Sequence, residues 1–132
     1  PYDERAYLDE QRDARLDVAY TQKSAPHYFG ITADFIEFSM TGDFDGTTVI
    51  MMGCEGLASD RTAQAFVDKG AATYISWDNT VSASHTDAST ERLLQHMVID
   101  GSSADDAVAQ TMAELGPDPT YDSVLRAYAG QR

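Results

Sequence analysis

A chain of 132 residues with 42% hydrophobic residues, seven Tyr, five Phe and one Trp can bury a core, which predicts a single domain over residues 1–132. The formal net charge of −13 argues against nucleic acid and anionic membranes as partners, because the long-range field of the protein repels phosphate. A single cysteine excludes an internal disulfide.

The acidity comes from sixteen Asp and six Glu against only two Lys. An Asp-rich, Lys-poor surface suits a halophilic host, because hydrated carboxylates keep a protein dissolved in concentrated salt. An ordinary acidic soluble protein is the alternative. No apolar run approaches the roughly 20 residues that span a bilayer, and no signal-peptide pattern opens the chain. We therefore expect a soluble protein and leave its compartment open.

The first third of the chain predicts short elements. Residues 1–14 are charge-rich and suit a short helix, and "ARLDVAYT" alternates apolar with polar residues as a half-buried strand does. "YFGIT" predicts a second strand. Thr32 is then a candidate N-cap for a helix that stops near Gly42.

The middle of the chain predicts a βαβ unit. "TTVIMMG" is apolar without alternation, which indicates a strand covered on both faces, and "AATYISW" predicts a second such strand. Between them, Ser59 is a candidate N-cap and Gly70 a C-terminal stop for a helix. A strand, a helix and a strand at this spacing predict two parallel strands.

Two helices and a last strand follow. Thr86 is a candidate N-cap for the first helix, and Ser102 with Asp105 resembles a capping box for the second, which Gly116 ends. "SVLRAY" predicts the final strand. Together these elements predict an α/β fold, a three-layer α/β/α sandwich with a mainly parallel sheet.

The chemistry-bearing residues gather where the predicted strands end. Cys54 directly follows "VIMMG", and in open parallel sheets reacting groups lie just past the carboxyl ends of the strands. The loop after the next strand, "DNTVSASHTD", leaves the same edge. It would bring Asp78, His85 and Asp87 into the neighbourhood of Cys54.

These residues carry a resemblance to a known family. A strand that ends in Cys54, then "EGLASDRTAQAFVDKGAATYISW" and later "DGSSADDAVAQTM" resemble the C-terminal half of the caspase-like cysteine peptidases, including gingipain and CHAT types and archaeal members. The resemblance covers Thr47 to Leu115. It implies a caspase-like fold, a peptide or protein substrate, no cofactor, and Cys54 as the nucleophile.

The chain departs from the family at the general base. In the family this base is a His followed by Gly, at the end of a strand that precedes the Cys strand. Only His27 precedes Cys54 here, and Tyr follows it in "SAPHYFG". Either the base lies upstream of Pro1, in a longer protein of which this is the C-terminal part, or the chain has lost it. The missing start methionine favours the first explanation.

Cys54 needs help to react, because a thiol with a pKa near 8.5 is mostly protonated at neutral pH. The start of the following helix would supply part of a positive field, and backbone N–H groups of Gly53, Glu55 and Gly56 would form an oxyanion site. The Glu55 charge opposes this activation. In the alternative interpretation, Cys54 is a small buried residue that fills a turn.

His85 is a candidate substitute base for Cys54, with Asp87 orienting the ring as in a catalytic triad. The alternative is a helix-start residue bonded to local backbone. His96 is interpreted as a surface or boundary residue.

No metal site is predicted. Asp43 and Asp45 alternate as in calcium loops, but the remaining ligands are missing, so a solvated turn is favoured. Tyr121 and Asp122 could line a pocket. The alternative to an enzyme is a non-catalytic binding or assembly module, which pairs along an uncovered sheet edge with a second copy or with an upstream segment of the same protein.

Overall fold

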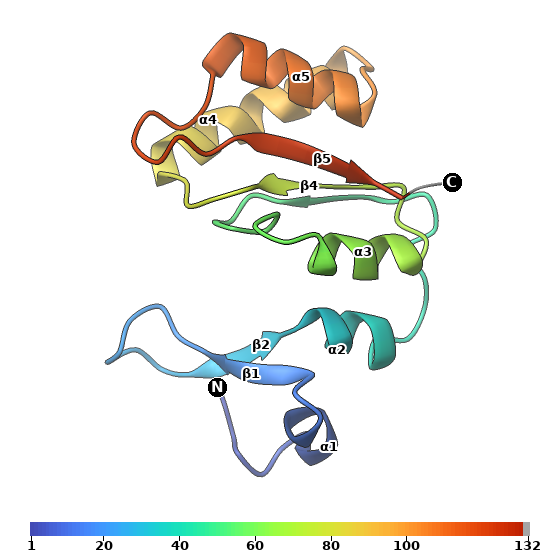
Figure 1. Ribbon diagram of the computed structural model, residues 1–132, viewed down its shortest axis with the longest axis vertical. Coiled ribbons are helices and arrows are strands. Elements are labelled where there is room, and N and C mark those ends of the chain that lie inside the picture. Colours follow the sequence, from blue (N-terminus) through green and yellow to red (C-terminus); the bar gives the residue numbers. More distant parts are fainter. Residues whose placement is uncertain (131–132) are drawn as a thin grey trace. The chain divides into compact units, whose positions relative to one another are not determined.

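The computed structural model describes residues 1–130, which divide into two compact units after Gly42 (Figure 1). The first unit is Pro1–Gly42, and the second begins at Asp43. Within residues 1–130, no helix combines the length and the apolar character that crossing a bilayer requires.

The first unit is a β-hairpin with a short helix before it and another after it. Its elements are α1 (Leu8–Arg12), β1 (Leu16–Ala19), β2 (Tyr28–Ile31) and α2 (Ala33–Phe38). β1 and β2 pair antiparallel, so both expected strands are confirmed. Thr32 caps α2 as expected, because its hydroxyl accepts a hydrogen bond from Phe35 N at 3.4 Å. Half-burial of β1 is not observed, since only Leu16 is buried in it.

The second unit contains a three-stranded sheet and most of the helical residues. Its elements are β3 (Thr48–Met51), α3 (Arg61–Asp68), β4 (Thr73–Trp77), α4 (Ala83–Leu94), the π-helical turn η1 (Gln95–Ile99), α5 (Ala104–Leu115) and β5 (Leu125–Ala129). The strand order is β3-β4-β5. β3 and β4 are parallel, which confirms the expected pair.

The expectation of a mainly parallel sheet is wrong, because β5 runs antiparallel to β4. The reason lies in the helices. α4 and α5 carry the chain out and back, so it re-enters the sheet beside the end of β4, where Trp77 faces Leu125. Hydrogen bonds between Asp78 and Val124 fix this entry: Asp78 N donates to the Val124 carbonyl at 3.2 Å, and Val124 N donates to Asp78 Oδ1 at 2.8 Å.

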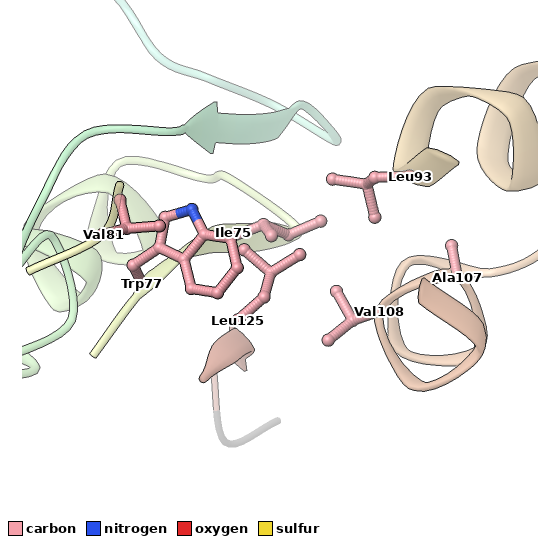
Figure 2. Packing of buried hydrophobic residues seen from close by; sticks show 7 residues of the cluster. All are labelled: Ile75, Trp77, Val81, Leu93, Ala107, Val108 and Leu125. Carbon is pink, nitrogen blue, oxygen red and sulfur yellow. The ribbon is translucent and has the colours of Figure 1, made fainter. Parts of the chain in front are cut away.

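The sheet has helices on both faces, and every residue of β4 is buried (Figure 1). On one face, Phe66 of α3 stacks on Tyr74 with ring centroids 5.6 Å apart. On the other face, Figure 2 shows residues of α4 and α5 pointing toward β4 and β5. This cluster contains Ile75, Trp77, Val81, Leu93, Ala107, Val108 and Leu125.

The helices are where expected, but three predicted N-caps are wrong. The N-cap residues are Asp60 for α3, Ser82 for α4 and Ser103 for α5, where Ser59, Thr86 and Ser102 were expected. Tertiary contacts explain Thr86: its hydroxyl accepts from Trp77 Nε1 at 3.0 Å and donates to the Met52 carbonyl at 2.9 Å. Thr86 thus satisfies a buried indole N–H instead of capping its helix.

His96 is buried, which corrects its interpretation as a surface or boundary residue. Its Nδ1 lies 3.0 Å from Asp100 Oδ2, and its Nε2 lies 3.1 Å from Glu114 Oε1. Arg92 contacts the other Glu114 oxygen at 2.9 Å. These contacts join α4 and η1 to α5.

Candidate active site at the ends of β3 and β4

The Cys54 thiol is exposed in a turn just past the end of β3. We call residues 53–58 the Cys54 turn. Because the thiol is exposed, the alternative of a buried filler residue is wrong. The expected helix field is also wrong, since α3 begins only at Arg61, beyond the Cys54 turn.

The Cys54 sulfur contacts the segment that follows β4. We call residues 78–82, which connect β4 to α4, the β4–α4 loop. Val81 N donates to Cys54 Sγ at 3.5 Å, and the thiol faces the Val81 carbonyl at 3.6 Å. Val81 thus presents both a donor and an acceptor to the sulfur, and a thiol is only a weak donor to a carbonyl.

Three further hydrogen bonds join the Cys54 turn to the end of β4 and the β4–α4 loop. Glu55 N donates to the Asn79 carbonyl at 3.0 Å, and Leu57 N donates to the Trp77 carbonyl at 2.9 Å. The Thr80 hydroxyl donates to Glu55 Oε1 at 3.2 Å. The Glu55 N–H is therefore engaged with Asn79 in this geometry and does not face a substrate oxyanion.

Glu55 also has a left-handed backbone, with φ of 61°. This region favours glycine, and other residues held there cost about 1–3 kcal/mol. The Asn79 bond holds this conformation directly beside Cys54. Tyr7, Ala14 and Asp122 also have a left-handed backbone, so this conformation does not by itself mark a site.

The two expected oxyanion glycines have different surroundings. A Cβ built on Gly56 would lie 2.9 Å from Ser76 Cβ and closer still to the Ser76 hydroxyl, so Gly56 lets the turn approach β4. Ser76 donates its own hydroxyl hydrogen to the Met51 carbonyl at 2.6 Å. Around Gly53, a built Cβ would meet nothing within 4 Å.

His85 lies in the first turn of α4, half-buried, with its ring centroid 5.5 Å from that of Trp77. Its Nε2 is 3.2 Å from the Gly116 carbonyl oxygen. Because a carbonyl only accepts, this contact places the ring hydrogen on Nε2 and leaves Nδ1 as the basic nitrogen of the neutral ring.

Asp87 is not brought to His85. It is exposed, and residues two apart on a helix point to different sides. The Gly116 carbonyl makes the orienting contact that was expected from Asp87.

The segment between α5 and β5 supports the β4–α4 loop. We call residues 116–124 the α5–β5 segment. Its Asp118 carboxylate accepts from Ser82 N at 2.9 Å and from the Ser82 hydroxyl at 2.5 Å. Its Ser123 hydroxyl donates to the Asn79 carbonyl at 3.2 Å. The sequence interpretation named neither residue; the signal available was an Asp between two prolines.

A concavity of about 1110 Å³ lies at the other end of β4, away from Cys54. Its lining includes Asp45, Gln64, Asp68, Asp105 and Tyr128. Gln64 donates to Asp68 at 2.6 Å and accepts from the Tyr128 hydroxyl, so these three side chains bond one another. The lining does not include Tyr121 or Asp122, the two residues expected at a pocket.

Within the described residues, no three His, Cys, Asp or Glu side chains are placed to hold a metal ion. Asp45 belongs to a backbone turn, in which Phe44 N donates to the Lys69 carbonyl at 2.7 Å and Gly46 N to the Gly70 carbonyl at 3.0 Å. Comparisons of the chain with family models, with curated proteins and with solved structures found no match.

Proposed function

We propose that this chain carries the reacting centre of a cysteine peptidase with a caspase-like fold. Cys54 is the nucleophile, and His85 takes its proton. The observation that carries the proposal is the exposed residue Cys54 just past the end of β3, with the Val81 N–H directed at its sulfur. The parallel β3–β4 pair supports the fold assignment.

The reaction divides into two steps. The Cys54 thiol gives its proton to His85 Nδ1, and the sulfur bonds to the carbonyl carbon of a peptide. The C–N bond breaks, and the amine leaves with the proton that His85 returns, so the acyl group stays on sulfur as a thioester. Water then hydrolyses the thioester, which releases a carboxylic acid and restores the thiol.

For the first proton transfer, His85 Nδ1 must come within hydrogen-bond reach of the Cys54 sulfur. In the described structure both hydrogen bonds of the sulfur go to Val81. The ring or the β4–α4 loop therefore has to shift when substrate binds. Catalytic contacts of this kind commonly tighten only in the substrate complex.

The same observation favours a second candidate function. If Cys54 serves only to join its turn to Val81, the chain is a non-catalytic binding or assembly module. Its partner would then be a peptide, a longer segment of the same protein or a second copy.

Labelling of Cys54 distinguishes the two functions. A set of peptidyl chloromethyl ketones, varied at the residue beside the ketone, is compared with chloroacetamide, and the adducts are located by mass spectrometry. A peptidase site binds the peptide part. For at least one ketone, the ratio of its rate to the rate of chloroacetamide should then be about tenfold higher with Cys54 than with free cysteine.

Cys54→Ser should abolish the adduct, and His85→Gln should slow it. The peptidase proposal is contradicted if every ketone reacts with Cys54 in the same ratio to chloroacetamide as with free cysteine. A discrete oligomer in light scattering, together with that result, would support the assembly module.

A further inference from the structure

The concavity at the amino end of β4 lies away from Cys54, and the reaction above does not use it. Its volume of about 1110 Å³ is enough for a small organic molecule. The lining comes from both sides of the sheet. Asp68 belongs to α3, whose Phe66 packs on one face, and Asp105 belongs to α5, which packs on the other.

The charged residues of the lining are all acidic. They are Asp45, Asp68 and Asp105, and among residues 1–130 the lining includes no Lys, Arg or His. Asp68 is also the last residue of α3, where the helix dipole disfavours a negative charge. The concavity therefore has a negative potential, which favours a cationic ligand.

The backbone fixes Asp45 beside the end of α3. Its neighbours Phe44 and Gly46 donate to the carbonyls of Lys69 and Gly70, and a Cβ built on Gly70 would lie only 3.3 Å from the Asp45 Cα. Gly70 has a φ of 95°, so a residue without a side chain permits this approach. Asp45 and Asp68 are thus held at the same end of α3.

A hydroxyl group opens into the same concavity. Thr73 lines it and is only 9% exposed, and its hydroxyl has no hydrogen-bond partner within residues 1–130. In that part of the chain, only the Ser89 hydroxyl is both enclosed and without a partner, so the Thr73 oxygen is not enclosed. Because buried polar groups nearly always have a partner, this oxygen points to a ligand that donates a hydrogen bond.

The arrangement of the carboxylates indicates the shape of the ligand. No three His, Cys, Asp or Glu side chains of the described residues are placed around one point to hold a metal ion. A linear molecule with several amino groups fits better, because separate ammonium groups can meet carboxylates from the two faces of the sheet. Its methylene chain would contact the apolar part of the lining, which consists of Val67, Ala71, Ala72 and Ala129.

We propose that this concavity binds a linear polyamine across the end of the sheet. The ammonium groups pair with Asp68 and Asp105, and the Thr73 hydroxyl accepts a hydrogen bond from the ligand. This inference goes beyond the proposed function and does not depend on the reactivity of Cys54.

Calorimetric titration with spermidine at one ionic strength tests the proposal. The wild type should bind it at a single saturable site. Butylamine, which carries one amino group, should bind at least about tenfold more weakly, because each further ammonium group of a bound polyamine pairs within the complex.

Thr73→Val is the decisive variant, because it removes the hydroxyl and keeps the net charge and nearly the same shape. It should weaken spermidine binding by about threefold or more. Since the hydroxyl has no partner in the fold of the described residues, urea denaturation of this variant should show no loss of stability. Asp105→Asn should weaken spermidine binding by about two- to fivefold.

Asp122→Asn is the matched control for charge. It makes the same chemical change at an exposed side chain outside the lining, where the backbone φ of 55° suits Asn. This variant should bind spermidine as the wild type does. The inference is overturned if binding does not saturate, or if Thr73→Val binds as the wild type does. Equal weakening by Asp105→Asn and Asp122→Asn also overturns it, because that result shows only a general attraction to an acidic surface.

Discussion

The ionisation of Asp118 follows from its hydrogen bonds. Burial by itself would raise the pKa of this carboxyl group, but the donors outweigh burial: the Ser82 hydroxyl and N–H, and the N–H groups of Tyr121 and Thr120. Together they hold the pKa of Asp118 well below its usual range. The fold therefore stabilises the ionised form of Asp118 relative to the protonated form, more than the unfolded chain does.

This pKa difference predicts how stability depends on pH. An unfolded Asp titrates near pH 3.9, so above about pH 5 Asp118 is ionised in both states and its stabilisation of the fold is complete. Below about pH 4 the unfolded chain takes up a proton that the folded protein does not, so the stabilisation is progressively lost.

We therefore expect Asp118→Asn to lower the free energy of unfolding clearly at pH 7, and by a smaller amount at pH 3. Urea denaturation at the two pH values measures the difference. Asp122→Asn serves as the control. A deficit of the same size at both pH values would contradict the account of Asp118.

At the scale of residues, the position of Cys54 could be predicted, because the residues that follow an apolar strand lie at the carboxyl end of that strand. Val81 and Asp118 could not. Their contacts depend on which loops lie side by side in the folded chain, and that arrangement depends on where β5 enters the sheet.

At the scale of elements, the Cys54 turn depends on a close approach to β4. Gly56 permits the approach, because any side chain there would overlap the fully buried Ser76. The turn can then hydrogen-bond to Trp77 and Asn79.

Gly56→Ala should therefore lower the free energy of unfolding by about 1–3 kcal/mol, as overpacking in a core does. Gly53→Ala is the matched control on the same turn, and should change stability by no more than about 0.5 kcal/mol because its surroundings are open. Thermal or urea denaturation measures both. Equal effects of the two substitutions would show that the turn does not pack on β4 as described.

The elements themselves were largely predictable. The apolar runs at β3 and β4 and the helical spacing of α5 gave the correct types and approximate bounds. The helix starts were less predictable, because a polar side chain such as Thr86 can cap its helix or satisfy Trp77, and sequence spacing does not decide between them. The direction of β5 was missed because it depends on the return path of α4 and α5.

At the scale of the whole molecule, the candidate site combines three segments that are distant in sequence: the Cys54 turn, the β4–α4 loop and the α5–β5 segment. Only folding brings them together.

The most direct measurement compares Cys54 in the folded chain with Cys54 in the same chain unfolded by urea. The rate constant for iodoacetamide is determined at pH 7 and one ionic strength, and N-acetylcysteine in each solution corrects for the effect of urea. The proposed role of Cys54 as a nucleophile predicts a rate for the folded chain that is higher by about tenfold, because a nucleophilic cysteine is activated by its folded surroundings. A folded chain that reacts as slowly as the unfolded one, or more slowly, would contradict it.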